Sequence, residues 1–199
     1  MPADSLRITL ARKKTELRQI IALQRENLVD HVPEETARSQ GFLTAVHTFP
    51  VLEAMNAATA AVIAKDGTRV VGYALAMKQE FAADVPALTE LFARQDAALL
   101  RKLDQFPDLS ADDLNYLVMG QICVAEGYRG RKLADRMYRY LRSCYSLHYP
   151  YLITAIDARN TRSRRVHERV GFTELDRFRQ RGDKEWILVI WRWREGGRP

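Results

Sequence analysis

Hydrophobic and polar positions follow two different periods along the chain, and each change of period marks a new element. Alternation at every second position, or a short apolar run, predicts a strand, whereas apolar positions three and four apart predict a helix. We expect strands at residues 6–10, 60–64, 70–77, 116–124, 151–156, 172–178 and 186–193. We expect helices at residues 15–28, 86–103, 131–147 and 161–170, and a further helix start at Pro33-Glu34-Glu35.

The order of these elements predicts one mixed α/β domain. A strand, a helix and a strand follow one another across residues 116–156, which indicates a parallel pair with a right-handed crossover. Asp66-Gly67 is typical of a hairpin turn, so its flanking strands should be antiparallel. We find no linker and no internal repeat, and therefore expect a single domain over residues 1–199, with a mixed, mostly antiparallel sheet and helices on both faces.

Composition narrows the class of protein. The chain has 199 residues, of which 47% are hydrophobic and 28% charged, as in ordinary water-soluble domains. It has no apolar run near the roughly 20 residues of a membrane span, and its first residues lack the apolar core of a secretion signal. We therefore expect a cytoplasmic protein without a membrane partner. We interpret the two cysteines, Cys123 and Cys144, as buried reduced thiols.

Charge is unevenly distributed. Residues 125–199 carry 18 Lys/Arg against 9 Asp/Glu, and residues 80–113 carry 3 against 8. The basic part is suited to phosphate, a nucleotide or nucleic acid, and the acidic part to a cationic ligand. Solvated faces would explain both excesses equally well.

A cationic helix start follows the strand at residues 116–124. Arg129-Gly130-Arg131-Lys132 opens the next helical pattern, although a helix N-terminus is itself partly positive. Three cations fit there if the free backbone N–H groups bind an anion. Because Gly130 has no side chain, such an anion could come close to the backbone. From this segment alone, a phosphate site and a solvated turn are equally supported. The glycine spacing matches neither a P-loop nor a dinucleotide-binding fingerprint.

A second polar stripe lies on the helix expected at residues 161–170. Asn160 can cap that helix, Ser163 follows three residues on, and His167 four residues further. At this spacing the three side chains share one helix face.

Together the two segments resemble the GNAT superfamily of N-acetyltransferases. That family's acetyl-CoA loop reads Gln/Arg-x-x-Gly-x-Gly/Ala after a strand that ends in valine. Here Arg129 to Ala134 follow Val124 at the right distance, with Lys132 in place of the central glycine. The family's second motif, Asn-x-x-Ala/Ser-x-x-x-Tyr-x-x-x-Gly-Phe, is matched by Asn160, Ser163, His167, Gly171 and Phe172, with histidine replacing tyrosine.

The resemblance implies acetyl transfer from acetyl-CoA to an amine by direct attack, without a metal. It also implies that the parallel strands splay apart and admit the pantetheine arm, with backbone groups of the first strand pairing with it and the pyrophosphate on the helix start. The residues expected to bind acetyl-CoA are Ile122, Cys123, Val124, Arg129, Gly130, Arg131, Lys132, Leu133, Ala134, Asp135, Asn160, Ser163 and His167.

Two residues are candidates for catalysis. His167 occupies the position of the family's tyrosine, which often protonates the departing sulfur, so it is a candidate general acid; packing beside the cofactor is the alternative. Some members carry a glutamate on the strand before the loop. Here Met119, Gly120 and Gln121 offer no carboxylate, so Gln121 is a weak candidate for positioning a water, and no general base is identified.

The acceptor is not encoded in any motif. The acidic segment fits a cationic small molecule or a lysine or N-terminal amine of a peptide. Two other classes stay open: a CoA-binding module without catalysis, and a nucleic-acid-binding protein, suggested by the basic C-terminal half and by Trp186, Trp191 and Trp193. No nucleic-acid motif supports the latter. The sequence also leaves a homodimer open.

Overall fold

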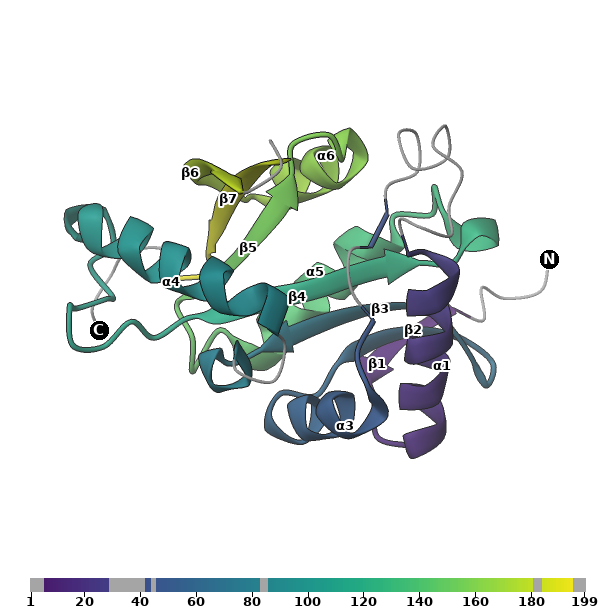
Figure 1. Ribbon diagram of the computed structural model, residues 1–199. Coiled ribbons are helices and arrows are strands. Elements are labelled where there is room, and N and C mark those ends of the chain that lie inside the picture. The colour runs from purple at the N-terminus through teal and green to yellow at the C-terminus, as the bar shows by residue number, and fades with distance from the viewer. Residues whose placement is uncertain (1–5, 29–41, 44–45, 83–85, 181–183, 195–199) are drawn as a thin grey trace.

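A computed structural model describes residues 6–28, 42–43, 46–82, 86–180 and 184–194. Seven strands form one sheet in the order β1-β2-β3-β4-β5-β7-β6 (Figure 1). Their bounds are β1 Leu6–Leu10, β2 Val62–Asp66, β3 Arg69–Met77, β4 Leu117–Val124, β5 Tyr151–Asp157, β6 Thr173–Gln180 and β7 Lys184–Arg192. Within this sheet β4 and β5 pair in parallel and every other neighbouring pair is antiparallel. The predicted mixed α/β class is confirmed.

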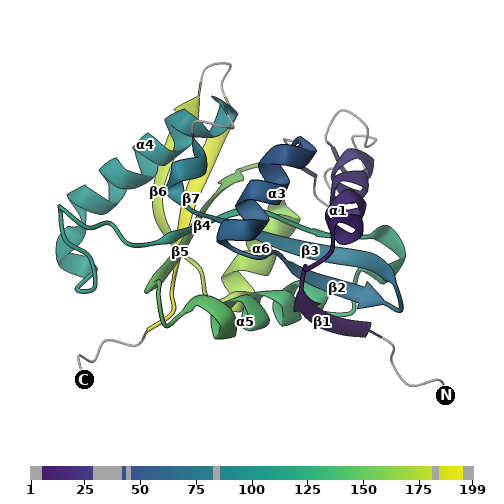
Figure 2. The ribbon, with the colours of Figure 1, turned by 90° about the horizontal axis from the view of Figure 1, so that it is seen from below.

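Helices cover both faces of the sheet. The helices are α1 Lys14–Glu26, α3 Phe49–Ala58, α4 Pro86–Arg101, α5 Leu133–Tyr145 and α6 Thr161–Val170. Short 3-10 turns are η2 Gln79–Ala82, η3 Leu103–Gln105 and η4 Glu126–Tyr128. In Figure 2, α1, α3 and α4 lie on one face of the sheet and α5 on the other. None of the described helices has both the length and the apolar character needed to cross a bilayer.

One predicted helix begins later than expected, and one helix was not predicted. The helix expected at residues 131–147 is α5, which begins only at Leu133 because Lys132 is left-handed, with φ 55° and ψ 24°. Helix α3 was missed, because its ten residues include several small side chains and bury only Leu52 and Met55. The helix start expected at Pro33 lies outside the described residues.

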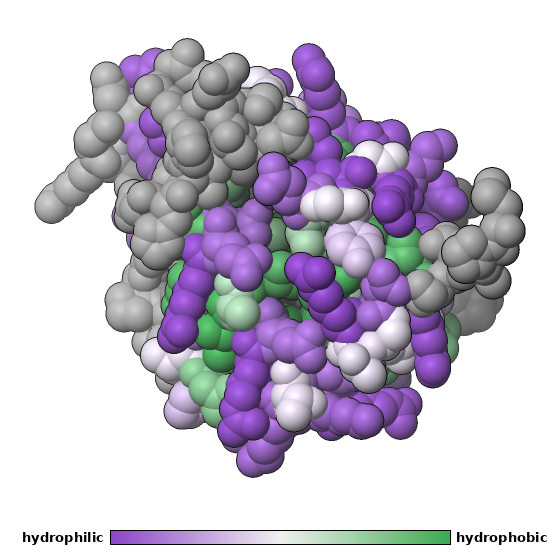
Figure 3. Space-filling model, turned by 90° about the vertical axis from the view of Figure 1, so that its right-hand side faces the viewer, coloured by the Kyte–Doolittle hydropathy of each residue, from purple (hydrophilic) through white to green (hydrophobic). Residues whose placement is uncertain are grey.

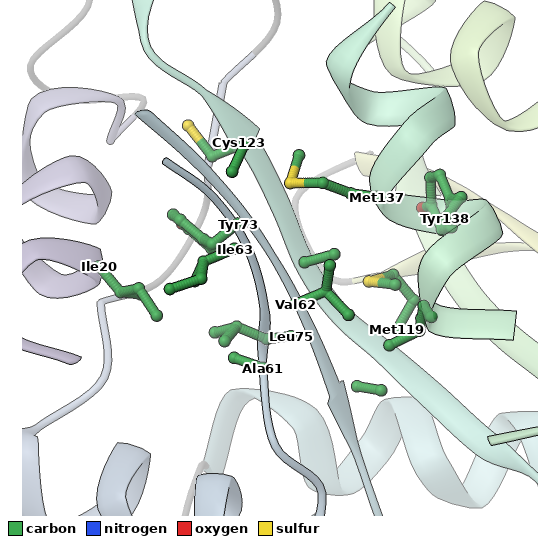
Figure 4. Close-up of a cluster of buried hydrophobic side chains, with 14 of the residues drawn as sticks. Ile20, Ala61, Val62, Ile63, Tyr73, Leu75, Met119, Cys123, Met137 and Tyr138 are labelled. Carbon is green, nitrogen blue, oxygen red and sulfur yellow. The ribbon is translucent and has the colours of Figure 1, made fainter. Parts of the chain in front are cut away.

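The hydrophobic core lies on both faces of the sheet, which packs against α1 on one side and against α5 on the other. Figure 4 shows Ile20 of α1 beside Ile63 and Tyr73 on one face, while Met137 and Tyr138 of α5 lie on the other. All five side chains are fully buried. Burying a large apolar side chain stabilises the fold by roughly 1.5–3 kcal/mol, so these contacts hold α1 and α5 against the sheet that carries the site.

The parallel strands separate soon after they meet. Pairing between β4 and β5 is limited to Leu117 with Leu152 and Val118 with Ile153. The register between β3 and β4 skips one residue at Gly120, which is a β-bulge, and bulges bend and twist a strand. This splay confirms the expected fold and leaves one edge of β4 open at its carboxyl end.

Candidate active site

A cavity of about 760 Å³ lies along the open edge of β4. Its walls come from β4, from the loop that leads to α5, from the first turn of α5 and from most of the length of α6. Asn27, Phe42 and Leu43 complete the lining. Figure 3 views the molecule from the side toward which the carboxyl end of β4 points in Figure 1, and polar side chains there surround apolar residues that lie deeper. The cavity is large enough for a small-molecule ligand.

Backbone groups of β4 face this cavity. The N–H of Ala125 donates to the carbonyl of Val71 at 2.9 Å. Because antiparallel pairs alternate, the backbone groups of Cys123 also point toward β3, and those of Ile122 and Val124 point into the gap. A ligand in the gap can therefore pair with the edge of β4.

Arg129 braces the loop beside that edge. Its Nε donates to the carbonyl of Val124 at 3.2 Å, and its Nη2 donates to Oδ1 of Asn27 at 2.7 Å. The carbonyl of Val124 thus already has one donor. Arg129 adds charge to the cavity, but two of its nitrogens hold the loop against β4 and α1.

The start of α5 is shaped by two left-handed residues, Gly130 with φ 82° and Lys132 with φ 55°. The first backbone bond at the helix start runs from the N–H of Arg136 to the carbonyl of Lys132, at 3.1 Å. The N–H groups of residues 133–135 therefore lack acceptors inside the helix. With the helix dipole they form an anion site at the end of the cavity.

Most of the predicted binding residues come together. Those that line the cavity are Ile122, Cys123, Val124, Arg129, Gly130, Lys132, Leu133, Ala134, Asn160, Ser163 and His167. Two others do not line it. Arg131 lies over the ring of Tyr128, 5.3 Å from its centroid. The buried carboxylate of Asp135 binds Arg169 through two hydrogen bonds of 2.9 and 3.0 Å, and so joins α5 to α6.

Helix α6 contributes three cations that were not predicted from the sequence. Arg162, Arg165 and Arg169 line the cavity together with Arg129 and Lys132, and no described acidic side chain lines it. Burial and the charges of Arg129 and Arg169 lower the pKa of Arg162. Arginines at helical spacing beside the polar stripe were the signal that could have revealed this wall.

His167 is buried between α6 and α5. Its Nδ1 lies 2.7 Å from the carbonyl of Ser163, which only accepts, so Nδ1 carries the proton. Its Nε2 lies 2.6 Å from the hydroxyl of Tyr138, which donates. Burial lowers the pKa of His167 to about 4. The ring is therefore neutral at pH 7 with both nitrogens engaged, which opposes the general-acid role and favours packing beside the cofactor.

Gln121 lies at a second, smaller cavity of about 90 Å³ between β4 and β5. Its Oε1 accepts a hydrogen bond from the hydroxyl of Tyr73 at 3.1 Å. The two cavities share Ile122 and the Asn160–His167 stripe, so they meet where the strands separate. The carboxylate at the smaller cavity, Asp157, is paired with Arg159 at 2.8 Å.

The two cysteines differ in burial. Burial raises the pKa of Cys123 to about 12, so its thiol stays protonated at neutral pH and does not act as a nucleophile. Cys123 is the buried thiol that the sequence indicated, whereas Cys144 is only partly buried, contrary to that interpretation. Both are free thiols.

Comparisons with known proteins agree with this geometry. A family model described as the acetyltransferase (GNAT) family matches residues 29–172. A search of curated proteins found no match.

Among solved structures, the ribosomal-protein-S18-alanine N-acetyltransferase from Escherichia coli is 10% identical, with a TM-score of 0.63 over 96% of each chain. YncA from Salmonella typhimurium, solved with acetyl-CoA, is 13% identical, with a TM-score of 0.64 over 98% of each chain. An N-acetyltransferase from Staphylococcus aureus is 15% identical, with a TM-score of 0.60 over 95% of this chain and 99% of that one. At such identities the likeness shows the fold. Because the family model spans most of its length, the chain belongs to the GNAT family of acetyl-CoA-dependent N-acetyltransferases.

Proposed function

We propose that this protein transfers an acetyl group from acetyl-CoA to a primary amine by direct attack in the gap between β4 and β5. The observation that carries the proposal is the cavity at that gap, where an open strand edge, an uncapped helix start and five cations converge. These groups suit the amide-bearing arm and the phosphates of CoA.

The chain's own groups have defined tasks in this proposal. The N–H groups of residues 133–135 and the side chain of Lys132 hold the pyrophosphate. The open N–H groups of Ile122 and Val124 align the pantetheine arm, and a donor at this edge stabilises the oxyanion that forms when an amine attacks a thioester. Holding the thioester and the amine in line supplies a large share of the rate.

The acceptor would reach the thioester through the smaller cavity. None of the described acidic residues between 80 and 113 lines either cavity. Asp96 instead accepts hydrogen bonds from Gln79 at 2.9 Å and from Tyr116 at 2.5 Å. The charge of this segment therefore lends no positional support to a cationic acceptor, and we propose only that the acceptor is a primary amine.

A CoA-binding module without catalysis is the second candidate, favoured by the neutral state and fixed contacts of His167. Nucleic-acid binding loses the support of two tryptophans, because Trp191 and Trp193 are buried in the core and cannot stack on bases.

A screen of primary amines that follows CoA release separates the two leading candidates. We expect turnover with at least one amine class, above the slow hydrolysis measured without amine, and no turnover by a Gly130→Asp variant. If acetyl-CoA binds saturably while no polyamine, amino acid, aminoglycoside or peptide amine is acetylated, the catalytic proposal fails and the binding module stands.

A further inference from the structure

Three of the five cations that line the large cavity have no partner in the described part of the chain. Arg129 is held by Asn27, and Arg169 is held by Asp135. Lys132, Arg162 and Arg165 make no hydrogen bond or ion pair with any described residue. All three line the cavity, and no described acidic side chain lines it with them.

These three cations lie on two different walls. Lys132 is the residue immediately before α5, next to the free N–H groups that form the anion site. Arg162 and Arg165 belong to α6 and are three residues apart, so they are neighbours on one helix face. Mutual repulsion opposes such a cluster: burial first, and then the charges of Arg129 and Arg169, lower the pKa of Arg162. An anion bound against α6 would relieve that repulsion.

We propose that Arg162 and Arg165 bind the 3′-phosphate of CoA, so that α6 selects acetyl donors that carry this phosphate group. The proposal rests on the proposed function. CoA has three phosphate groups, of which two form the pyrophosphate. The proposed function assigns the start of α5 and Lys132 to the pyrophosphate, which leaves the ribose 3′-phosphate for the two arginines. Guanidinium groups match phosphate oxygens with paired hydrogen bonds.

This assignment makes a prediction about the donor. Dephospho-CoA lacks the 3′-phosphate but keeps the pyrophosphate, and phosphopantetheine on a carrier protein lacks the whole nucleotide. The protein should therefore prefer free CoA thioesters to both. Neither the helix start nor the strand edge would produce a preference between CoA and dephospho-CoA.

Calorimetric titration with CoA and with dephospho-CoA tests the assignment. The wild type should bind dephospho-CoA about 10- to 100-fold more weakly than CoA, as expected for losing charge-assisted hydrogen bonds. The double variant Arg162→Gln/Arg165→Gln should bind CoA only as tightly as the wild type binds dephospho-CoA, and should bind dephospho-CoA unchanged. Arg164→Gln is the matched control. Arg164 lies on the same helix, but its charge helps to lower the pKa of Glu174 and it does not line the cavity. It should keep the wild-type preference.

Equal affinity of the wild type for the two compounds would overturn the assignment. So would an equal loss of affinity for both compounds in the double variant, because the arginines would then contact the pyrophosphate. If the wild type bound neither compound, the proposed function itself would fail, which is a different outcome from losing only the preference.

Discussion

Replacing Lys132 by glycine tests the backbone conformation on which the anion site depends. Lys132 stands where the family keeps a glycine, and it is the one described residue other than glycine with a positive φ. Its side chain is exposed, so truncation removes little packing. We therefore expect Lys132→Gly to stabilise the protein while weakening the binding of acetyl-CoA.

The size of the effect follows from two opposing terms. A residue with a Cβ pays roughly 1–2 kcal/mol in the left-handed region, whereas glycine loses roughly 0.5–1 kcal/mol more backbone entropy on folding than alanine. The glycine variant should gain about 0.5–1 kcal/mol over the wild type. In a domain of this length, that corresponds to a rise in Tm of about 2 °C.

Lys132→Ala is the matched control, because it removes the same charge and keeps the Cβ. Urea denaturation should rank the glycine variant above the alanine variant, while titration shows the same loss of acetyl-CoA affinity in both. At an ordinary helical position the order reverses, with glycine about 1 kcal/mol less stable than alanine. Such a reversal would refute the left-handed conformation of Lys132.

Further predictions concern Gly171, His167 and Cys123. A Cβ at Gly171 would lie 2.9 Å from Nε1 of Trp191 at a φ of 118°, so Gly171→Ala should lose about 2–4 kcal/mol of unfolding free energy; a loss below about 0.5 kcal/mol in urea would contradict this packing. The pKa of His167 is about 4 in the folded protein and about 6.5 when unfolded, so the unfolded state binds the proton more tightly. The contribution of His167 to the free energy of unfolding is fully present above pH 6.5 and falls by about 3 kcal/mol toward pH 4. The unfolding free energy of the wild type minus that of His167→Phe should show this fall, since His47 is common to both proteins; a flat difference would show that His167 is not held neutral. His167→Phe should also keep most of kcat at pH 7 and pH 9, whereas a loss of about 100-fold at an unchanged KM would restore the general-acid role. Because the pKa of Cys123 is raised to about 12, Cys123→Ala should keep full kcat, and peptide mapping should find native Cys123 unalkylated by iodoacetamide at pH 8; rapid alkylation would show an accessible thiolate.

The sequence predicted the parts of the fold that local patterns determine. Alternation and four-residue spacing located β4, α5 and β5 in order, and the cap of α6 forms as expected, with the N–H of Ser163 donating to Oδ1 of Asn160 at 3.0 Å. Helix α3 was not predicted, because its small residues give little difference in polarity between its two faces.

Properties of the site that arise from distant contacts were not predictable. Asp135 contributes its backbone N–H to the anion site, but the sequence did not show that Arg169, 34 residues later in the chain, holds its carboxylate. The neutral state of His167 likewise depends on burial against Tyr138 of another helix. A single sequence shows residue types, and it does not show which charges the fold has already paired.

Titration of the wild type and of Gly130→Asp with acetyl-CoA tests the central claim most directly. Gly130 has a φ of 82°, and a Cβ added there would have open space around it, with no neighbouring atom within 4 Å. Aspartate therefore adds backbone strain and a negative charge at the anion site without a steric clash. We predict saturable one-site binding by the wild type and loss of binding by Gly130→Asp in a protein that remains folded by circular dichroism. No saturable binding by the wild type at millimolar acetyl-CoA, or equal affinity in the folded variant, would contradict the account.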